Sequence, residues 1–237
     1  LLEELIGEFG NSFPKTALFS SFARSLVKDV DPISEPDVAL LKWFDMDEKL
    51  FFLMEENIVK ERLQQGFVEN GEVNVKMFIN FSLSVQNRRK SRAGYSLENH
   101  ICALLDANGI EYSHTPVTEN RSKPDFLFPN IECYRNMNFN AENLTMLGAK
   151  STCKDRWRQV LAEADRIDRK HLLTLEAAIS TYQTDEMQDK HLQLVVPQQI
   201  HCTYTESQRK WLYSVADFLD EIKEKQRKTP YAAMLRL

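Results

Sequence analysis

The chain has 237 residues, of which 43% are hydrophobic and 27% are charged, and its formal net charge is −5. This composition predicts a folded protein with a sizeable core and excludes a largely disordered chain. No apolar run approaches the ~20 residues that span a bilayer. No basic-then-apolar signal segment is present at the N-terminus, so we expect a cytoplasmic protein without a membrane partner. The negative charge does not favour nucleic acid as a partner but does not exclude it, because a local basic face sets the affinity for phosphate.

The first third of the chain is predicted to be mostly helical. Leu18, Phe22 and Leu26 recur at helical spacing, and Asp31-Pro32 is expected to end that helix. We interpret residues 1–70 as a helical subregion with its own apolar core. The alternative is that some of its aromatic side chains face a groove and contact DNA bases or a partner subunit.

The strongest basic run of the chain covers residues 86–92 and holds four cations in five residues. Such a run often forms the solvated end of a helix, where it complements the helix dipole. The alternative is phosphate contact, with Gln86 or Arg88 reaching a groove edge.

A helix is predicted directly after the basic run, over residues 96–109. Ser96 is its expected cap and Gly109 its expected end. Glu98 then lies in the first turn, where it either favours the positive helix end or stands beside a functional site.

The remainder of the chain alternates strands and helices, which predicts an α/β domain with a mixed β-sheet flanked by helices. An irregular loop is expected over 130–143 and a final helix over 206–225. The expected strands cover residues 112–115, 125–128, 144–150, 171–175 and 192–197.

A further helix is predicted after the strand that ends at Lys150. Thr152 is its expected cap, with Asp155 as a capping-box variant. Trp157 and Val160 belong to its apolar stripe, and Glu163 falls at the edge of that stripe, where a carboxylate can point into a cleft.

Three charged residues of this part form a candidate catalytic constellation. Asp125 opens one strand, Lys150 ends another, and Glu163 lies on the helix that packs back on the sheet. Metal-dependent phosphodiester hydrolysis needs carboxylates for the cation and a positive group for the developing charge. The alternative is that all three are ordinary strand-end and helix-flank charges.

Pro124-Asp125, Lys150 and Glu163 resemble a variant of the PD-(D/E)xK nuclease motif in which the acidic residue two before the lysine is missing. Gly148 holds that place, and Glu163 substitutes for the missing acid. The segments 86–94, 96–98 and 154–160 look like the EcoRII group of Type II restriction endonucleases. The specific part of this resemblance covers about residues 86–170.

The resemblance implies a restriction-endonuclease-like core over residues 71–230, preceded by the helical subregion 1–70 and followed by a tail, 231–237. It implies that Asp125 and Glu163 bind Mg²⁺ and that Lys150 is catalytic.

Two further residues join the candidate catalytic set. Glu98 is implied to support the site. Tyr134, in the loop over 130–143, is included without an assigned role.

The resemblance also implies double-stranded DNA as the partner, read at a CCWGG-type site. Lys154, Asp155 and Arg156 would read its C·G pairs, because Lys and Arg donate to guanine and Asp accepts from cytosine. A near-palindromic site implies a two-fold symmetric homodimer. Relatives flip the central base pair, and we expect the receiving pocket within the first 60 residues. The N-terminal effector domain of such enzymes is expected to be absent here. This expectation fits the start at Leu1-Leu2-Glu3, which has no initiator Met and looks like that of a fragment.

We therefore predict a Mg²⁺-dependent Type II restriction endonuclease. A non-catalytic, sequence-specific DNA-binding module with the same fold is the alternative. A helical interaction domain without a nucleic-acid role is a third hypothesis, suggested only by the acidic composition.

Overall fold

The computed structural model describes residues 1–228, which fall into two compact units. The first unit comprises Leu1–Asp29 and Lys42–His100, and the second comprises Val30–Leu41 and the described residues from Ile101 onward. The predicted tail 231–237 lies outside the described residues. The predicted boundary at residue 70 falls inside the first unit, and the division into 1–70 and 71–230 stays a prediction.

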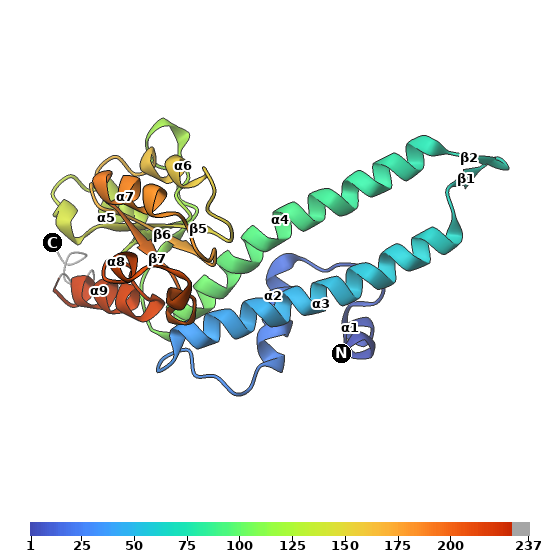
Figure 1. The fold of residues 1–237 in the computed structure, drawn as a ribbon, viewed down its shortest axis with the longest axis horizontal. Helices are drawn as coiled ribbons and strands as arrows, with labels where there is room; N and C mark the ends of the chain where they lie inside the picture. The colour runs from blue at the N-terminus through green and yellow to red at the C-terminus, as the bar shows by residue number, and fades with distance from the viewer. Residues whose placement is uncertain (229–237) are drawn as a thin grey trace. The chain divides into compact units, whose positions relative to one another are not determined.

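The first unit is built from helices, as predicted for residues 1–70. It contains α1 (Leu2–Phe9), α2 (Thr16–Leu26) and most of the two long helices α3 (Pro36–Gln65) and α4 (Val75–Ala107). The short strands β1 (Val68–Glu69) and β2 (Glu72–Val73) join these long helices in an antiparallel hairpin (Figure 1). Its core is a cluster of buried apolar residues: Leu5, Phe19, Ala23, Leu50, Phe51 and Met54.

Helix α4 is longer than predicted. It runs through the basic run and through the predicted helix 96–109 as one 33-residue element. Ser96 is buried inside it, so the prediction that Ser96 caps a helix was wrong. Gly94 is the only helix-weakening residue just before Ser96, and a helix tolerates a single glycine at modest cost.

The second unit contains a five-stranded mixed sheet, which confirms the predicted fold class. Its strand order is β3-β4-β5-β6-β7. The first three strands pair antiparallel and the last three pair parallel. The strands are β3 (Ser113–His114), β4 (Phe126–Phe128), β5 (Thr145–Lys150), β6 (Lys170–Thr174) and β7 (Leu192–Val195). Each parallel pair is joined by a helical crossover, as parallel pairing requires.

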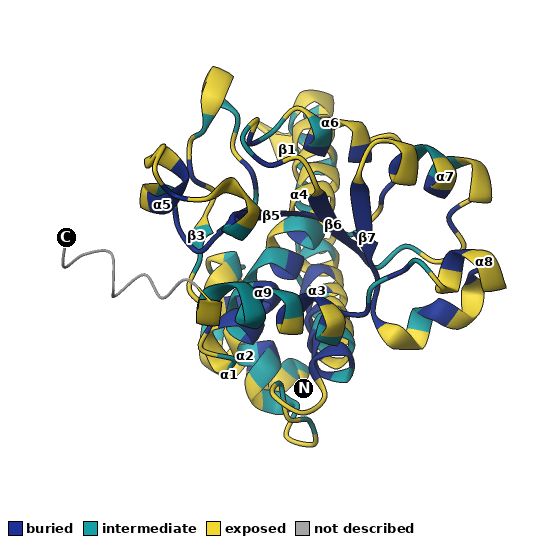
Figure 2. Cartoon of the chain, turned by 90° about the vertical axis from the view of Figure 1, so that its left-hand side faces the viewer, coloured by how far each residue is buried: buried dark blue, intermediate teal, exposed yellow. Residues whose placement is uncertain are grey.

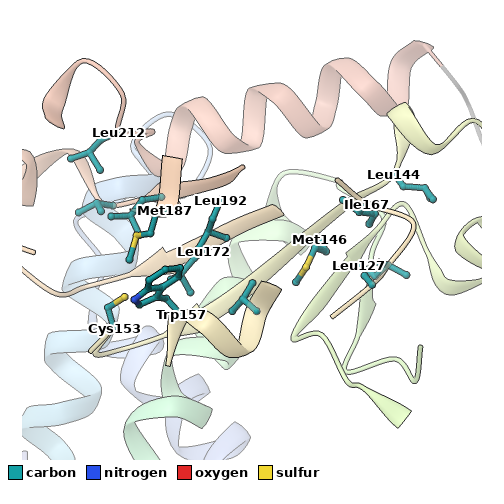
Figure 3. Packing of buried hydrophobic residues seen from close by; sticks show 14 of the residues in the cluster. Leu127, Leu144, Met146, Cys153, Trp157, Ile167, Leu172, Met187, Leu192 and Leu212 are labelled. Atoms are coloured by element: carbon teal, nitrogen blue, oxygen red, sulfur yellow. The ribbon is translucent and has the colours of Figure 1, made fainter. Parts of the chain in front are cut away.

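Helices cover both faces of this sheet, so β4 to β7 are buried (Figure 2). On one face, Leu172 shares an apolar cluster with Trp157 of α6 (Trp157–Leu161) and Met187 of α7 (Thr181–Asp189) (Figure 3). On the opposite face, Phe128 and His171 contact the ring of Phe218 in α9 (Val215–Lys228), with centroid separations of 5.7 Å and 5.2 Å.

The predicted final helix over 206–225 is instead two helices, α8 (Glu206–Arg209) and α9. The break has a backbone cause. Tyr213 donates its N–H to Leu194 O at 3.1 Å and accepts from Val196 N at 2.9 Å, so its backbone bonds to the sheet edge. Ser214 then caps α9, its hydroxyl oxygen accepting from the Asp217 N–H at 3.0 Å.

None of the described helices has the length and apolar character needed to cross a bilayer.

Short helical elements complete the second unit. The loop predicted over 130–143 contains a helical turn that begins after Asn130, whose side chain caps it. These elements are η1 (Glu119–Arg121), α5 (Ile131–Arg135), η2 (Ala141–Asn143) and η3 (Gln198–Thr203).

Candidate active site

The structure brings Asp125 and Lys150 together at one end of the β4–β5 pair. Asp125 immediately precedes β4 and Lys150 is the last residue of β5. The Asp125 Oδ2 atom accepts one hydrogen bond from the Ala149 N–H and another from Lys150 Nζ, both at 2.7 Å. Both side chains are largely buried, with 14% and 18% exposure. Strand pairing therefore fixes the aspartate and the lysine against each other.

Glu163 lies in the turn that follows α6, and the prediction that it lies on a helix was wrong. Helix α6 ends at Leu161, and Ala164 has a φ of 51°, which a continuing helix does not allow. Within the described part of the chain, Glu163 Oε2 is buried without a hydrogen-bond partner.

The charges that act on Glu163 include those of Asp125 and Lys150. Burial, together with the negative charge of Asp125, raises the pKa of Glu163 to about 7. The positive charges of Lys150 and Lys170 act in the opposite direction. The three predicted catalytic residues therefore share one electrostatic environment.

Two cations of the second unit hold the turn that carries Glu163. Lys170, which is mostly buried, donates from Nζ to Leu161 O at 2.8 Å, just before the turn. Arg166, just after Glu163, donates to Tyr134 O and, at 2.9 Å, to Phe139 O. Sequence reasoning missed both residues, because nothing in the local pattern distinguishes them from surface charges.

Tyr134 belongs to the same support. Its ring is buried, and its hydroxyl donates to Glu119 Oε2 at 2.6 Å while accepting from the Arg166 N–H at 3.3 Å. These contacts stabilise the turn after Glu163. A catalytic role for Tyr134 stays a prediction.

Gly148 has a steric reason for its place in the motif. A Cβ atom at this position would lie 2.8 Å from Val160 Cγ2 and 3.3 Å from Val160 Cγ1. Val160 is fully buried on α6, so this close approach of helix and strand leaves no room for a side chain at residue 148. An acidic residue two before the lysine is therefore excluded by packing, and Glu163 reaches the site from the far end of α6.

The segment between Lys150 and α6 is an irregular loop, so the predicted cap at Thr152 was wrong, as was the capping box with Asp155. Helix α6 begins only at Trp157, and Lys154 has a φ of 38°. Glu176 explains the difference, because its Oε2 accepts hydrogen bonds from the N–H groups of Cys153 and, at 3.1 Å, Lys154. Glu176 was not predicted as a functional residue.

The candidate base-reading residues Lys154, Asp155 and Arg156 are all exposed on this loop. Arg156 donates to Thr152 O at 2.7 Å, and Asp155 accepts from Arg158 at 3.1 Å. The loop thus presents a cation, a carboxylate and a second cation in succession, beginning four residues beyond Lys150.

The remaining predicted residues lie in the first unit. Gln86, Arg88 and Glu98 are on α4, and the Arg88 guanidinium lies 4.8 Å from the centroid of the Phe13 ring. Their roles in DNA binding or in support of the site stay predictions.

Part of the basic run serves the fold of the first unit. Arg89 forms an ion pair with Glu55, and Arg92 forms one with Asp47. Two of its four cations therefore neutralise buried carboxylates.

The carboxylate oxygen atoms of Asp125 and Glu163 suit a hard cation that takes only some of its ligands from the protein. Within residues 1–228, no group of three His, Cys, Asp or Glu residues could hold a metal ion. Both hydrogen bonds to Asp125 end on Oδ2, and Glu163 Oε2 is unpartnered. Two carboxylates with oxygen atoms left without hydrogen bonds fit Mg²⁺, which binds through one or two carboxylates and keeps several non-protein oxygen ligands.

Comparison with known proteins gives a consistent result. The family described as EcoRII C terminal matches residues 51–219. The Type II restriction enzyme EcoRII of Escherichia coli is 42% identical over 189 residues, which cover 79% of this chain and 46% of that enzyme. The chain thus spans about half the length of this curated relative.

Solved structures support the fold. Metal-depleted Ecl18kI in complex with uncleaved, modified DNA aligns with a TM-score of 0.76 and 19% identity, covering 97% of this chain and 84% of that chain. A complex of restriction endonuclease PspGI with substrate DNA aligns with a TM-score of 0.74 and 16% identity, covering 91% and 94%.

Proposed function

Because the chain belongs to the family of the EcoRII C-terminal domain, we propose that it is the catalytic part of a Type II restriction endonuclease. Its substrate is double-stranded DNA with a CCWGG-type site, and its cofactor is Mg²⁺. The observation that carries the proposal is the convergence of Asp125, Lys150 and the unpartnered Glu163 carboxylate. A cytoplasmic location is part of the proposal.

The strand-end residues perform the chemistry in this proposal. Mg²⁺ held by Asp125 and Glu163 would supply the Lewis-acid charge that phosphodiester hydrolysis requires. The Lys150 ammonium is held 2.7 Å from Asp125 Oδ2, so it is fixed in place before substrate binds. From there it stabilises the negative charge that develops on the phosphoryl oxygens and orients the attacking water.

The loop after Lys150 reads the DNA in this proposal. Lys154 and Arg156 donate to guanine O6 and N7, and Asp155 accepts from cytosine N4. The three side chains are exposed and follow one another, as contacts with neighbouring base pairs require. A near-palindromic site is cut on both strands, so we propose that two copies form a two-fold symmetric homodimer on the DNA.

Plasmid cleavage followed by run-off sequencing tests activity, site and cut position together. The wild-type chain is expected to cut at CCWGG in Mg²⁺ and not in EDTA. Lys150→Ala should lose cleavage by at least about a hundredfold while still retaining a CCWGG duplex in a gel-shift assay. Lys210→Ala is the matched control, because Lys210 is an exposed lysine whose only ion pair is to the exposed Glu206 among the described residues.

Three outcomes would contradict the proposal. Cleavage by Lys150→Ala at the wild-type rate would remove Lys150 from the site. Specific retention without any cleavage by the wild-type chain would favour the non-catalytic DNA-binding module. A salt-independent lack of any DNA retention would exclude a nucleic-acid role.

A further inference from the structure

One side-chain contact links the end of β6, beside Lys150, to the exposed base-reading loop. Glu176 follows β6 by two residues, and β6 pairs in parallel with β5 so that Lys150 lies opposite Thr174. The Glu176 carboxylate points back across this strand end. A single oxygen, Oε2, accepts the N–H groups of both Cys153 and Lys154.

The backbone of Glu176 is itself fixed from two sides. Its N–H donates to the hydroxyl of the buried Thr174 at 3.2 Å. Its carbonyl accepts from the hydroxyl of the buried Tyr204 at 2.6 Å. The carboxylate therefore extends from a rigid base, so its position is set by the sheet.

The backbone that Glu176 holds is in a conformation that needs support. Lys154 has a φ of 38°, in the left-handed region that a lysine rarely adopts without surrounding contacts. On its N-terminal side Cys153 is buried in the apolar cluster beside Trp157 (Figure 3). The burial of Cys153 anchors one end of the turn, and Glu176 fixes the two amide groups at its centre.

We infer that Glu176 is a positioning residue for sequence recognition, and this inference rests on the proposed function. By holding the Cys153 and Lys154 amides, it sets the direction of the Lys154, Asp155 and Arg156 side chains relative to Lys150. Glu176 acts as a hydrogen-bond acceptor through the loop and touches neither DNA nor cation. A correctly read sequence is thereby presented at a fixed distance from the catalytic strand end.

The test compares Glu176→Ala with Glu176→Gln. Glutamine keeps a carbonyl oxygen of the same reach, which accepts both amides as Oε2 does, but it carries no charge. Glu142→Ala is the control, since Glu142 is an exposed acidic residue in the short helix η2 of the same unit. Circular dichroism melting establishes that each variant is folded.

Two measurements are made on each variant. Hydrogen exchange followed by mass spectrometry reports protection of the peptide covering residues 151–156. Gel-shift titration without divalent cation reports the ratio of affinities for a CCWGG duplex and a scrambled duplex.

We expect Glu176→Ala to exchange these amides at least about tenfold faster and to lower the affinity ratio by roughly tenfold, the size of one lost base contact. Glu176→Gln and Glu142→Ala should remain near wild type in both measurements. Binding to the scrambled duplex should be unchanged throughout, because the phosphate contacts do not depend on the loop direction.

Several results would overturn the inference. Unchanged exchange in Glu176→Ala would show that the carboxylate does not hold the loop. Faster exchange with an unchanged affinity ratio would show that the loop conformation does not set recognition. A Gln variant as defective as the Ala variant would assign the role to the charge of Glu176. If the wild-type chain prefers neither duplex, the proposed function fails, and the exchange data still report whether the loop is held.

Discussion

Two buried carboxylates, one in each unit, are treated in opposite ways. In the first unit, Asp47 has Arg92 at 2.5 Å from one oxygen and His100 at 3.3 Å from the other. In the second unit, Glu163 Oε2 is buried without a hydrogen-bond partner in the described residues. The difference lies in the ion pair: Asp47 Oδ1 is paired with Arg92, whereas Asp47 Oδ2 and Glu163 Oε2 both lack a hydrogen-bond partner in the described residues.

The pKa values follow this difference. Burial alone raises the pKa of Asp47, but the interactions of its carboxylate with His100 and Arg92 outweigh burial and bring the value to about 2. For Glu163, burial and Asp125 act together and raise the pKa to about 7. A buried charge with its partners in place serves the fold, whereas one without them marks a position where an external cation compensates.

The largest expected effect comes from removing the carboxylate of the Asp47–Arg92 ion pair. Asp47→Ala should lower the free energy of unfolding by about 3–5 kcal/mol, because Arg92 is left buried and unpaired. Urea denaturation followed by circular dichroism measures it. Asp45→Ala, at an exposed position of the same helix, should stay within about 0.5 kcal/mol of wild type. Equal effects from both variants would contradict the distinction.

Removing the charge of Glu163 should lower the activity without lowering the stability of the fold. Glu163→Gln is expected to lower plasmid cleavage in Mg²⁺ by at least about a hundredfold, because a cation ligand is lost. Its free energy of unfolding should equal or exceed that of wild type, because an uncompensated buried charge is removed. Single-turnover cleavage and urea denaturation of one preparation decide this. A large loss of stability would show that Glu163 is structural.

A third prediction concerns the packing of Gly148 against Val160 of α6, the helix that precedes Glu163. Gly148→Ala should cost about 1–3 kcal/mol of unfolding free energy, because the added methyl group overlaps buried Val160. Gly94→Ala is the matched control. No heavy atom lies within 4 Å of its new Cβ, so this helical substitution should stabilise by about 0.5–1 kcal/mol. Thermal melting of both variants measures the contrast, and a stabilised Gly148→Ala would refute the steric explanation.

The smallest effect is expected from pH. The folded pKa of Asp47 lies below its ordinary value of 3.8, so its contribution is fully present above about pH 4 and is lost as the pH falls towards 2. Burial also lowers the pKa of His100 from 6.5, so stability should begin to fall below about pH 6.5. Urea midpoints between pH 7 and pH 3 measure this slope. Asp47→Asn should show a flatter slope below pH 4.

The strands and their chemistry were predictable from sequence because each is a local pattern. Continuous apolar runs predicted β4 to β7. Charged residues at two strand ends made Asp125 and Lys150 candidates, and the family resemblance then favoured a catalytic role for them. The helix boundaries near the site were not predictable, because distant groups decide them. Glu176 takes the amides that Thr152 was expected to cap, and the backbone of Tyr213 bonds to the sheet instead of extending a helix.

Long-range support was likewise invisible in the sequence. Lys170 and Arg166 stabilise the Glu163 turn through backbone carbonyls of residues 9 to 32 positions away. Any lysine or arginine can make such a bond, and no spacing rule selects the partner. The candidate constellation therefore had a signature in the residue types, while its supporting contacts became visible only in three dimensions.

The close approach of Gly148 and Val160 also bears on how this arrangement can change over generations. A form of the motif with the acidic residue at position 148 would need an acidic side chain there and a smaller residue than Val160 on α6. At least two substitutions would therefore have to occur together. Either one alone is expected to impair the chain: an acid at residue 148 overlaps Val160, and a smaller residue at 160 opens a cavity. The two forms of the motif are thus separated by a fitness valley, and a lineage that holds Glu163 in this role is expected to keep it.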